Sequence, residues 1–128
     1  MRNTVMPCPC GSGKSLDQCC GRNIDGDAAP TAEVLMRSRY SAYALRREDY
    51  LLATWHHSTR PRELGFAREA PPKWLGLEVK RHEQADADHA VVEFVARYKI
   101  NGRAQRLQEV SRFVREDGRW FYLDGDLL

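Results

Sequence analysis

The sequence lacks long hydrophobic runs and has little excess charge of either sign. No stretch of its 128 residues approaches the roughly 20 apolar residues of a membrane-spanning helix. Residues 1–7 lack the apolar segment that is typical of a secretory signal. The formal net charge of +2 is too small to predict a broad nucleic-acid-binding surface. These features predict a cytoplasmic protein with no membrane partner, and they do not favour nucleic acid as a ligand.

The sequence also lacks the motifs of several common enzyme classes. It contains no phosphate-binding loop, no dinucleotide-binding fingerprint and no Ser–His–Asp order. An enzymatic activity is therefore not favoured, but it stays open. The hydrophobic content of 42% is enough to build a core without disulfides in a chain of this size.

Four cysteines do occur, and all lie within 13 residues: Cys8, Cys10, Cys19 and Cys20. Four thiolates satisfy a tetrahedral Zn²⁺ with no further ligand, and such a closed set has no open position for catalysis. A disulfide framework and an iron–sulfur cluster are the alternatives, but nothing predicts export and the spacing differs from common cluster motifs. Residues 1–23 are otherwise too poor in apolar side chains to form a core. Metal binding would therefore supply the folding free energy of this segment.

The rest of the chain predicts helices followed by an antiparallel meander. Residues 24–30 are typical of a linker, and Thr31 is a candidate helix N-cap. Asn101-Gly102 and Asp117-Gly118 are strong signals for two-residue hairpin turns. The expected order is a helix over Val34–Arg47, a short helix over Asp49–Trp55, an irregular connection over 58–72, and strands over Trp74–Arg81, His89–Ile100, Arg103–Arg115 and Arg119–Asp124. This order predicts an α+β domain over residues 31–128.

The first of these turns fixes a strand register that places a carboxylate on the core-facing side. Phe94 should face Glu109, and Val92 should face Ser111. Continuing through the second turn places Asp124 beside Ser111. A carboxylate on a core-facing position must be paired, solvated in a cavity or protonated.

The cysteine segment resembles a known motif. Cys8-Pro9-Cys10-Gly11-Ser12-Gly13-Lys14-Ser15, followed by Cys19-Cys20-Gly21, is similar to the SEC-C motif, which is named for the C-terminal tail of the SecA translocase. The resemblance implies that Cys8, Cys10, Cys19 and Cys20 are zinc ligands. Because the SecA tail is a zinc-dependent docking site, the resemblance also implies a protein partner.

The longer segment resembles the YchJ-like family of small bacterial proteins. The residues that carry the resemblance are Leu35–Tyr43, Tyr50-Leu51, Thr54–His56, Ser111–Phe113 and Trp120–Gly125. The family resemblance implies a middle domain similar to the nuclear transport factor 2 cone, in which helices pack into a curved sheet. Two departures stand out. No second cysteine motif follows near Leu128, and His57 stands where the family often has proline.

Such a cone commonly encloses a pocket, which gives a second candidate site. The residues expected to face it are Arg37, Arg39, Tyr40, Tyr43, Trp55 and His56 from the helices, and Glu109, Ser111 and Asp124 from the sheet. They predict either a polar ligand site with His56 and Glu109 as acid–base groups, or an internal network in which arginines pair with Glu109 and Asp124. Adjacent histidines on a helix diverge by about 100°, so His56 and His57 are not expected to share a metal ion.

Three functions follow from these observations. The leading hypothesis is a zinc-binding cytoplasmic adaptor that docks a protein partner through residues 1–23. The alternative is an enzyme or small-ligand-binding protein that uses the cone cavity. A weaker alternative is an RNA- or ribosome-associated factor, suggested by the basic helix of Arg37, Arg39, Arg46 and Arg47.

Overall fold

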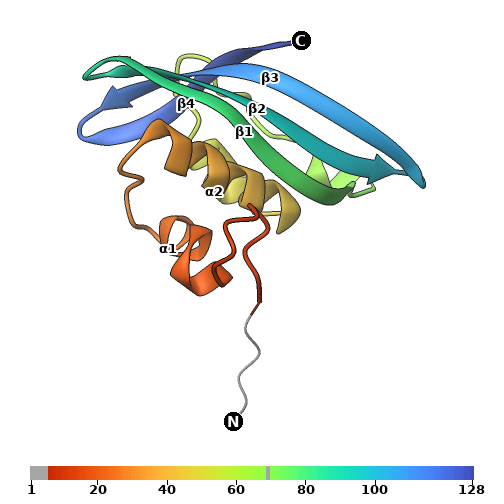
Figure 1. Ribbon diagram of the computed structural model, residues 1–128. Helices are drawn as coiled ribbons and strands as arrows, with labels where there is room; N and C mark the ends of the chain where they lie inside the picture. The colour runs from red at the N-terminus through yellow and green to blue at the C-terminus, as the bar shows by residue number, and fades with distance from the viewer. Residues whose placement is uncertain (1–5, 69) are drawn as a thin grey trace.

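The chain folds into three layers in the computed structural model, which describes residues 6–68 and 70–128 (Figure 1). A curved four-stranded sheet forms the first layer. Helix α2 (Ala32–Ala44) lies beneath the sheet, and the N-terminal segment with helix α1 (Cys20–Ile24) lies beneath α2. Residues 1–5 of the predicted motif 1–23, and residue 69 of the predicted connection, lie outside the described residues.

Helix α2 begins directly after the predicted N-cap, and both main helices end earlier than predicted. The Thr31 hydroxyl accepts a hydrogen bond from the backbone N–H of Val34 at 3.2 Å, so Thr31 caps α2. The helix ends at Ala44, before the predicted Arg47, because Arg46 adopts the left-handed backbone conformation with φ of 61°. Helix α3 (Glu48–Ala53) follows. Two short 3₁₀ turns, η1 (Leu16–Gln18) and η2 (Phe66–Arg68), complete the helical segments of the described residues.

The sheet is an antiparallel meander in the order β1-β2-β3-β4, and it confirms the predicted α+β class. Its strands are β1 (Lys73–Asp86), β2 (His89–Ile100), β3 (Arg103–Glu116) and β4 (Arg119–Leu127). Both predicted hairpin turns are present. Each has positive φ at its two central residues, 51° and 77° at Asn101-Gly102 and 52° and 78° at Asp117-Gly118.

The predicted register holds between β2 and β3 and fails in part between β3 and β4. Phe94 pairs with Glu109 and Val92 with Ser111, as expected. A β-bulge opposite Arg112 and Phe113 then shifts β4 by one residue. Ser111 therefore pairs with Gly125, and the predicted pairing of Ser111 with Asp124 is wrong.

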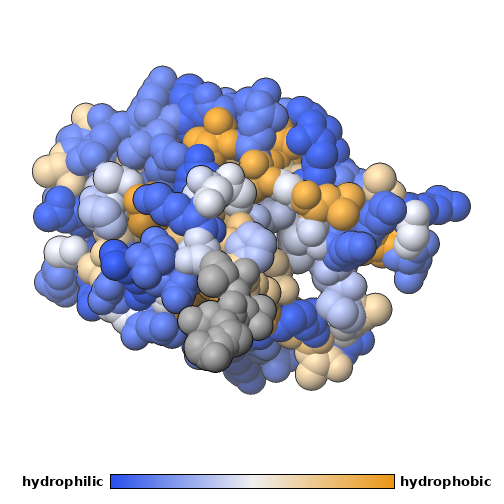
Figure 2. Space-filling model, turned by 60° about the horizontal axis from the view of Figure 1, so that its bottom comes forward, coloured by the Kyte–Doolittle hydropathy of each residue, from blue (hydrophilic) through white to orange (hydrophobic). Residues whose placement is uncertain are grey.

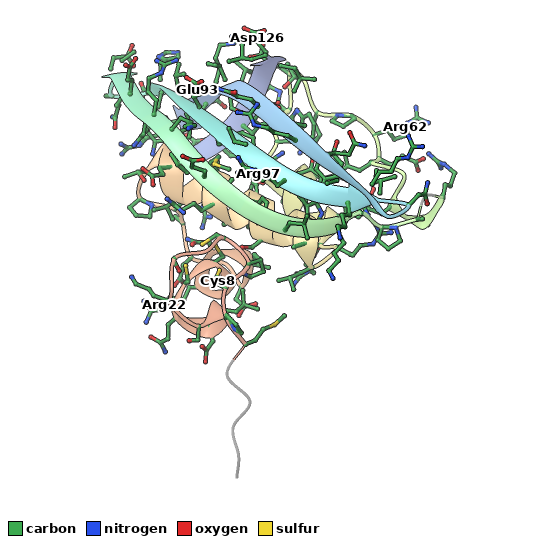
Figure 3. The ribbon with its side chains drawn as sticks, turned by 45° about the vertical axis from the view of Figure 1, so that its right-hand side comes forward. Cys8, Arg22, Arg62, Glu93, Arg97 and Asp126 are labelled. Carbon is green, nitrogen blue, oxygen red and sulfur yellow. The ribbon has the colours of Figure 1, made fainter. Side chains whose placement is uncertain are left out.

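The two faces of the sheet differ in character. Along β2, Glu93 and Arg97 alternate with Phe94 and Ala96, so they lie on the face opposite α2 (Figure 3). Glu93 accepts hydrogen bonds there from Gln108 at 2.6 Å and from Arg81 at 3.3 Å. The inner face, in contrast, carries the apolar residues that pack against the helix.

One apolar cluster connects all three layers. It comprises Cys8, Cys10, Cys20, Ala29, Ala32, Leu35, Met36, Tyr40, Ala90, Val92, Ala96, Phe113 and Trp120. Each large apolar side chain buried in this way contributes about 1.5–3 kcal/mol to stability. The cluster contains three of the cysteines and also Ala29 of the predicted linker 24–30. The cysteine segment therefore packs onto the main domain. Within the described residues, no helix has both the length and the apolar character needed to cross a bilayer.

Candidate functional site

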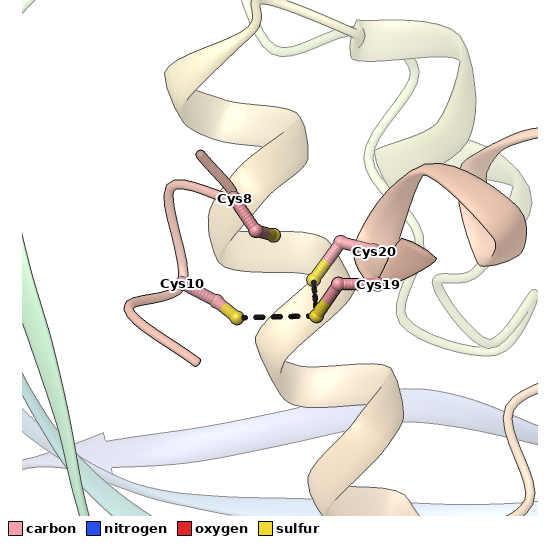
Figure 4. A group of neighbouring side chains, drawn as sticks. All are labelled: Cys8, Cys10, Cys19 and Cys20. Carbon is pink, nitrogen blue, oxygen red and sulfur yellow. Dashed lines mark hydrogen bonds between the residues drawn. The ribbon is translucent and has the colours of Figure 1, made fainter. Parts of the chain in front are cut away.

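The cysteines are presented by two short elements of the N-terminal segment. Residues 6–8 run antiparallel to residues 14–16, with the backbone N–H of Leu16 donating to Met6 O at 2.7 Å and that of Cys8 donating to Lys14 O at 2.9 Å. This hairpin carries Cys8 and Cys10. Cys19 and Cys20 stand at the start of α1, and all four side chains converge beside α2 (Figure 4). We call residues 6–24 the cysteine module.

The spacing of the sulfur atoms fits a tetrahedral metal centre. All four Sγ atoms lie within 4.8 Å of one another, and the distances are 3.7 Å from Cys10 to Cys19 and 4.0 Å from Cys19 to Cys20. A tetrahedron with metal–sulfur bonds of about 2.3 Å has sulfur atoms about 3.8 Å apart. None of the four cysteines forms a disulfide. The predicted ligands therefore have the geometry of a metal-binding cluster.

The electrostatics of the cluster disfavour four thiolates in the absence of a cation. The hydrogen bond from Cys20 lowers the pKa of Cys10 to about 4. The same bond, together with burial, raises the pKa of Cys20, and burial raises that of Cys19. The protein alone thus favours a thiolate at Cys10 and disfavours one at Cys19 and at Cys20. A divalent ion would supply the charge that holds all four sulfurs as thiolates.

Polar contacts from neighbouring residues surround the four cysteines and connect them to α2. The Ser12 hydroxyl lies 3.1 Å from the Cys19 sulfur, and the Ser41 hydroxyl of α2 lies 3.5 Å from the Cys8 sulfur. Arg37 donates to the Cys10 carbonyl at 3.4 Å and pairs with Glu33 at 3.0 Å. Arg37 was expected in the cone cavity. It lies instead at the cysteine module, because it is two residues and therefore about 200° around the helix from Arg39.

A cavity of about 250 Å³ lies between α2 and the inner face of the sheet. It holds six of the nine predicted cavity residues: Arg39, Tyr40, Tyr43, Trp55, Glu109 and Ser111. The other lining residues are Met36, Trp74, Phe94, Ala96, Leu107, Phe113 and Tyr122. The walls are therefore mainly aromatic and aliphatic, with two oppositely charged groups among them.

Glu109 is held by hydroxyl groups rather than by an arginine. Its Oε2 atom accepts hydrogen bonds from the Ser111 hydroxyl at 2.7 Å and the Tyr122 hydroxyl at 3.0 Å. Burial and the neighbouring Glu109 carboxylate raise the pKa of Tyr122. Gly125 makes room for this arrangement, since a Cβ atom there would lie 2.7 Å from the Glu109 Cδ. Within the described chain no arginine lies within ion-pair distance of Glu109, so the expected internal network does not form there.

Arg39 is the buried cation of the cavity, with 6% of its surface exposed. Its Nη1 donates to the Leu51 carbonyl at 2.8 Å and to the Thr54 hydroxyl at 2.7 Å. Its guanidinium carbon lies 4.7 Å from the ring centre of Tyr122 and 5.2 Å from that of Trp55, distances typical of cation–π contacts. Burial lowers the pKa of Arg39.

His56 and Asp124 lie outside the cavity, contrary to expectation. After α3, the backbone of residues 54–56 runs along β4, with His56 N–H donating to Tyr122 O and Tyr122 N–H donating to Thr54 O, both at 2.8 Å. Successive side chains of an extended segment point to opposite sides, so Trp55 faces the cavity and His56 faces away. The bulge likewise places Asp124 across from Arg112, with which it forms an ion pair at 2.5 Å. The predicted acid–base pair of His56 and Glu109 is therefore not assembled.

His56 and His57 lie closer together than predicted. Their ring centres are 4.3 Å apart, and with Glu116 they bring three candidate ligand atoms within 4.8 Å of one another. The expected divergence is wrong because residues 55–57 are not helical. The Ser58 N–H donates to His56 Nδ1 at 3.2 Å, so Nε2 carries the proton and donates to Glu116 at 2.7 Å. His56 is therefore a hydrogen-bond partner of Glu116 in this structure.

Seven residues that line the cavity were not predicted from the sequence, Tyr122 and Trp74 among them. Tyr122 pairs with Phe113 on the core-facing side of the sheet, and its position two residues from Asp124 along the same predicted strand is the signal that could have found it. Trp74 is the second residue of β1, and its ring centre lies 5.9 Å from that of Tyr43, but nothing in the neighbouring sequence predicts that contact. The need for Gly125 follows from the bulge, which the sequence does not reveal.

The fold and the site together define a class: a cone-shaped α+β domain that carries an N-terminal four-cysteine module. Residues 7–22 match the SEC-C motif, and residues 31–125 match the family described as YchJ, middle NTF2-like domain. The chain therefore belongs to the YchJ-like family, as its sequence motifs predicted. Its relatives include the UPF0225 protein of Chromobacterium violaceum, 61% identical over 124 residues that cover 92% of this chain and 90% of the relative. A second, from Methylibium petroleiphilum, is 57% identical over 98% of this chain and 92% of its own length.

Two solved structures are similar to the whole arrangement. The solution structure of a SEC-C motif containing protein from Rhodopseudomonas palustris has a TM-score of 0.84 and 35% sequence identity, and it covers 96% of this chain and 99% of its own. The crystal structure of a SEC-C motif containing protein from Psychrobacter arcticus has a TM-score of 0.78 and 31% identity, and it covers 91% of this chain and 80% of its own. Each likeness covers more than nine-tenths of this chain.

Proposed function

We propose that this chain is a cytoplasmic adaptor that binds one Zn²⁺ through its four cysteines and docks a protein partner on the cysteine module. The convergence of the four Sγ atoms supports the zinc assignment, because sulfur donors favour zinc over Mg²⁺ or Ca²⁺. Four protein ligands leave no coordination site for a substrate. The proposed role of the ion is therefore structural: it holds the cysteine module in the shape that the partner binds. Free thiols fit a reducing compartment, which supports the cytoplasm.

A groove beside the cysteine module supports the docking role. It has a volume of about 290 Å³, an apolar lining from Met6, Leu16, Ile24 and Leu45, and charged residues Asp17, Asp25 and Arg47. Met6 is 48% exposed, and methionine is enriched among interface residues. The face of the molecule seen in Figure 2 is mostly hydrophilic, with hydrophobic residues gathered in limited areas. The partner we propose inserts an apolar side chain into the groove and places a basic side chain beside Asp17 and Asp25.

The other two functions have less support at this site. The enzyme hypothesis loses the acid–base pair that it required, because His56 lies outside the cavity. The RNA hypothesis rests on the arginines of the basic helix, but Arg39 is buried and Arg37 pairs with Glu33. The neighbouring residues 6–27 contain two basic and three acidic residues. Four thiolates on one divalent ion would add negative charge there, which disfavours contact with phosphates.

Elemental analysis of the purified protein tests the metal assignment. We expect one zinc per chain, and we expect Cys19→Ser to reduce that content strongly, since three sulfurs form an open and weaker site. Ser111→Ala, which changes a residue of the distant cavity, should keep the full zinc content. Iron with the visible absorption of an iron–sulfur cluster, or zinc content that survives Cys19→Ser, would contradict the assignment.

Affinity capture from a cell extract tests the docking role without disturbing the cysteines. Met6→Asp places a charge in the groove, while Ile100→Asp changes a residue of similar exposure, 43%, at the β2–β3 turn. A partner that binds the wild type and Ile100→Asp but not Met6→Asp supports docking at the module. Equal capture by all three proteins, or no saturable partner, would contradict it.

A further inference from the structure

We propose that the cavity beneath the sheet binds a small, neutral, planar molecule that carries a hydrogen-bond acceptor next to a hydrogen-bond donor, as an aromatic carboxamide does. This inference goes beyond the docking function, since the cavity is built from α2, the segment after α3 and the sheet. It rests on three groups whose hydrogen-bonding capacity the protein leaves unused.

The first group is the buried guanidinium of Arg39. Arginine has five N–H donors, and the two acceptors of Arg39 are both reached through Nη1. Its Nε and Nη2 donors have no acceptor among the described residues, and none of the ion pairs there includes Arg39. A buried cation normally finds a carboxylate or further acceptors. The remaining N–H groups of Arg39 therefore suit an acceptor on a ligand.

The second group is the indole N–H of Trp55. Its Nε1 atom is fully buried and has no hydrogen-bond partner within the described part of the chain. A buried indole N–H usually has one. The Trp55 ring lies 5.2 Å from the Arg39 guanidinium carbon, and both residues line the cavity. This donor without an acceptor lies beside Arg39, so the Trp55 indole signal can report on a ligand that binds there.

The third group is the Glu109 carboxylate. Its two hydrogen bonds both end on Oε2, so Oε1 has no donor among the described residues. Oε1 therefore suits an N–H or O–H of the ligand. Tyr122 connects the two ends, because its ring lies under Arg39 and its hydroxyl donates to Glu109. Arg39 and Glu109 therefore both contact the Tyr122 side chain, which places them close enough for one small ligand to meet both.

Charge and shape narrow the ligand class further. Arg39 disfavours a cation and Glu109 disfavours an anion, so a neutral molecule fits the pair best. Tyr43, Trp74 and Phe94 add flat aromatic walls, against which a planar ring packs well. The volume of about 250 Å³ lies below the roughly 300–1,000 Å³ of sites for drug-sized ligands, so it suits a molecule of one ring.

Four probes with the same ring test the proposal: benzamide, benzoate, benzylamine and toluene. The indole N–H signals of the three tryptophans can be followed by NMR with ¹⁵N-labelled, zinc-loaded full-length protein, and Trp55→Phe assigns the signal of Trp55. We expect benzamide to shift the Trp55 signal with a Kd of about 1 mM or tighter, as suits a ligand of this size. Trp120 lies outside the cavity lining, so its signal should stay in place. The other three probes should bind at least tenfold more weakly.

Matched variants test which groups recognise benzamide. Arg39→Met and Glu109→Gln should each weaken its binding about tenfold, and Glu109→Gln keeps the shape of the side chain if Arg39→Met folds poorly. Arg37→Met, on the same helix outside the cavity, and Glu93→Gln, on the outer face of the sheet, should bind as the wild type does.

Three results would overturn the proposal. If toluene binds as tightly as benzamide, the cavity recognises apolar rings and not polar groups. If benzoate binds most tightly, the cavity is an anion site. An unmoved Trp55 signal with all four probes would remove ligand binding altogether. None of these outcomes bears on the adaptor function, because partner capture is expected to be the same in the cavity variants and the wild type.

Discussion

Gly125 leaves space for the Glu109 carboxylate, so Gly125→Ala tests the geometry of the cavity directly. The three atoms nearest to an added Cβ all belong to the Glu109 side chain, including Cδ at 2.7 Å and Cγ at 3.0 Å. The carboxylate must therefore move, and it cannot do so while it accepts hydrogen bonds from Ser111 and Tyr122.

The expected cost follows from those two hydrogen bonds. A hydrogen bond to a charged group contributes about 1.5–3 kcal/mol. Alanine is about 0.5–1 kcal/mol better than glycine inside a strand, which offsets part of the loss. The net destabilisation should be about 3 kcal/mol, or a fall of roughly 12 °C in Tm for a chain of this length.

Urea unfolding of four proteins measures this coupling: wild type, Gly125→Ala, Glu109→Ala and the double variant. Once Glu109 is alanine, nothing opposes the new Cβ, so Gly125→Ala should be neutral or slightly stabilising in that background. The coupling free energy of the cycle should be about 3 kcal/mol. If Gly125→Ala costs the same in both backgrounds, the contact between Gly125 and Glu109 does not explain the glycine.

Three further predictions concern other parts of the chain. Removing zinc with a chelator should destabilise the whole chain by several kcal/mol, because structural zinc sites contribute about 10 kcal/mol or more in isolated peptides. The loss should appear as a single calorimetric transition, because the cysteines share one apolar cluster with α2. Two separate transitions would contradict a shared core. The hydrogen bond from His56 lowers the pKa of Glu116 below 4.5. The bond therefore stabilises the fold above pH 4.5, and this stabilisation is lost as the pH falls through the lower pKa of the folded state. The Tm difference between wild type and Glu116→Gln should be present at pH 7 and should shrink in acid. A difference that grows in acid would refute this direction. Asn101→Ala should cost about 1 kcal/mol in urea unfolding, because Asn101 has φ of 51°, whereas Asn101→Gly should be close to neutral, and equal losses would argue against backbone strain as the cause.

The features that the sequence predicted correctly are those that depend on short-range signals. Asn101-Gly102 determines the pairing of β2 with β3, because a two-residue turn leaves one register, and that register places Phe94 opposite Glu109. The cysteine cluster is equally local, since the spacing and the residue type reveal it without any knowledge of the fold.

The features that were missed depend on contacts between distant segments. Asp124 differs from its prediction because the bulge in β4 has no marker in the residues around it. His56 was placed on a helix, but its segment leaves α3 and joins the edge of β4, which reverses the side to which it points. Arg37 and Arg39 are near neighbours on one helix. Which of them faces the sheet depends on where the cysteine module packs, and composition does not reveal this.

Helix α2 lies between the cysteine module and the sheet, and this placement limits how the chain can change over generations. Four residues of α2 have 0% exposure: Ala32, Ser38, Ser41 and Ala42. Few positions of α2 can therefore be substituted without a change in its packing. A new side chain that suits the sheet must also be tolerated by the layer around the cysteines. The two sites are therefore expected to drift together during evolution, and an engineer who redesigns one of them will have to redesign the other.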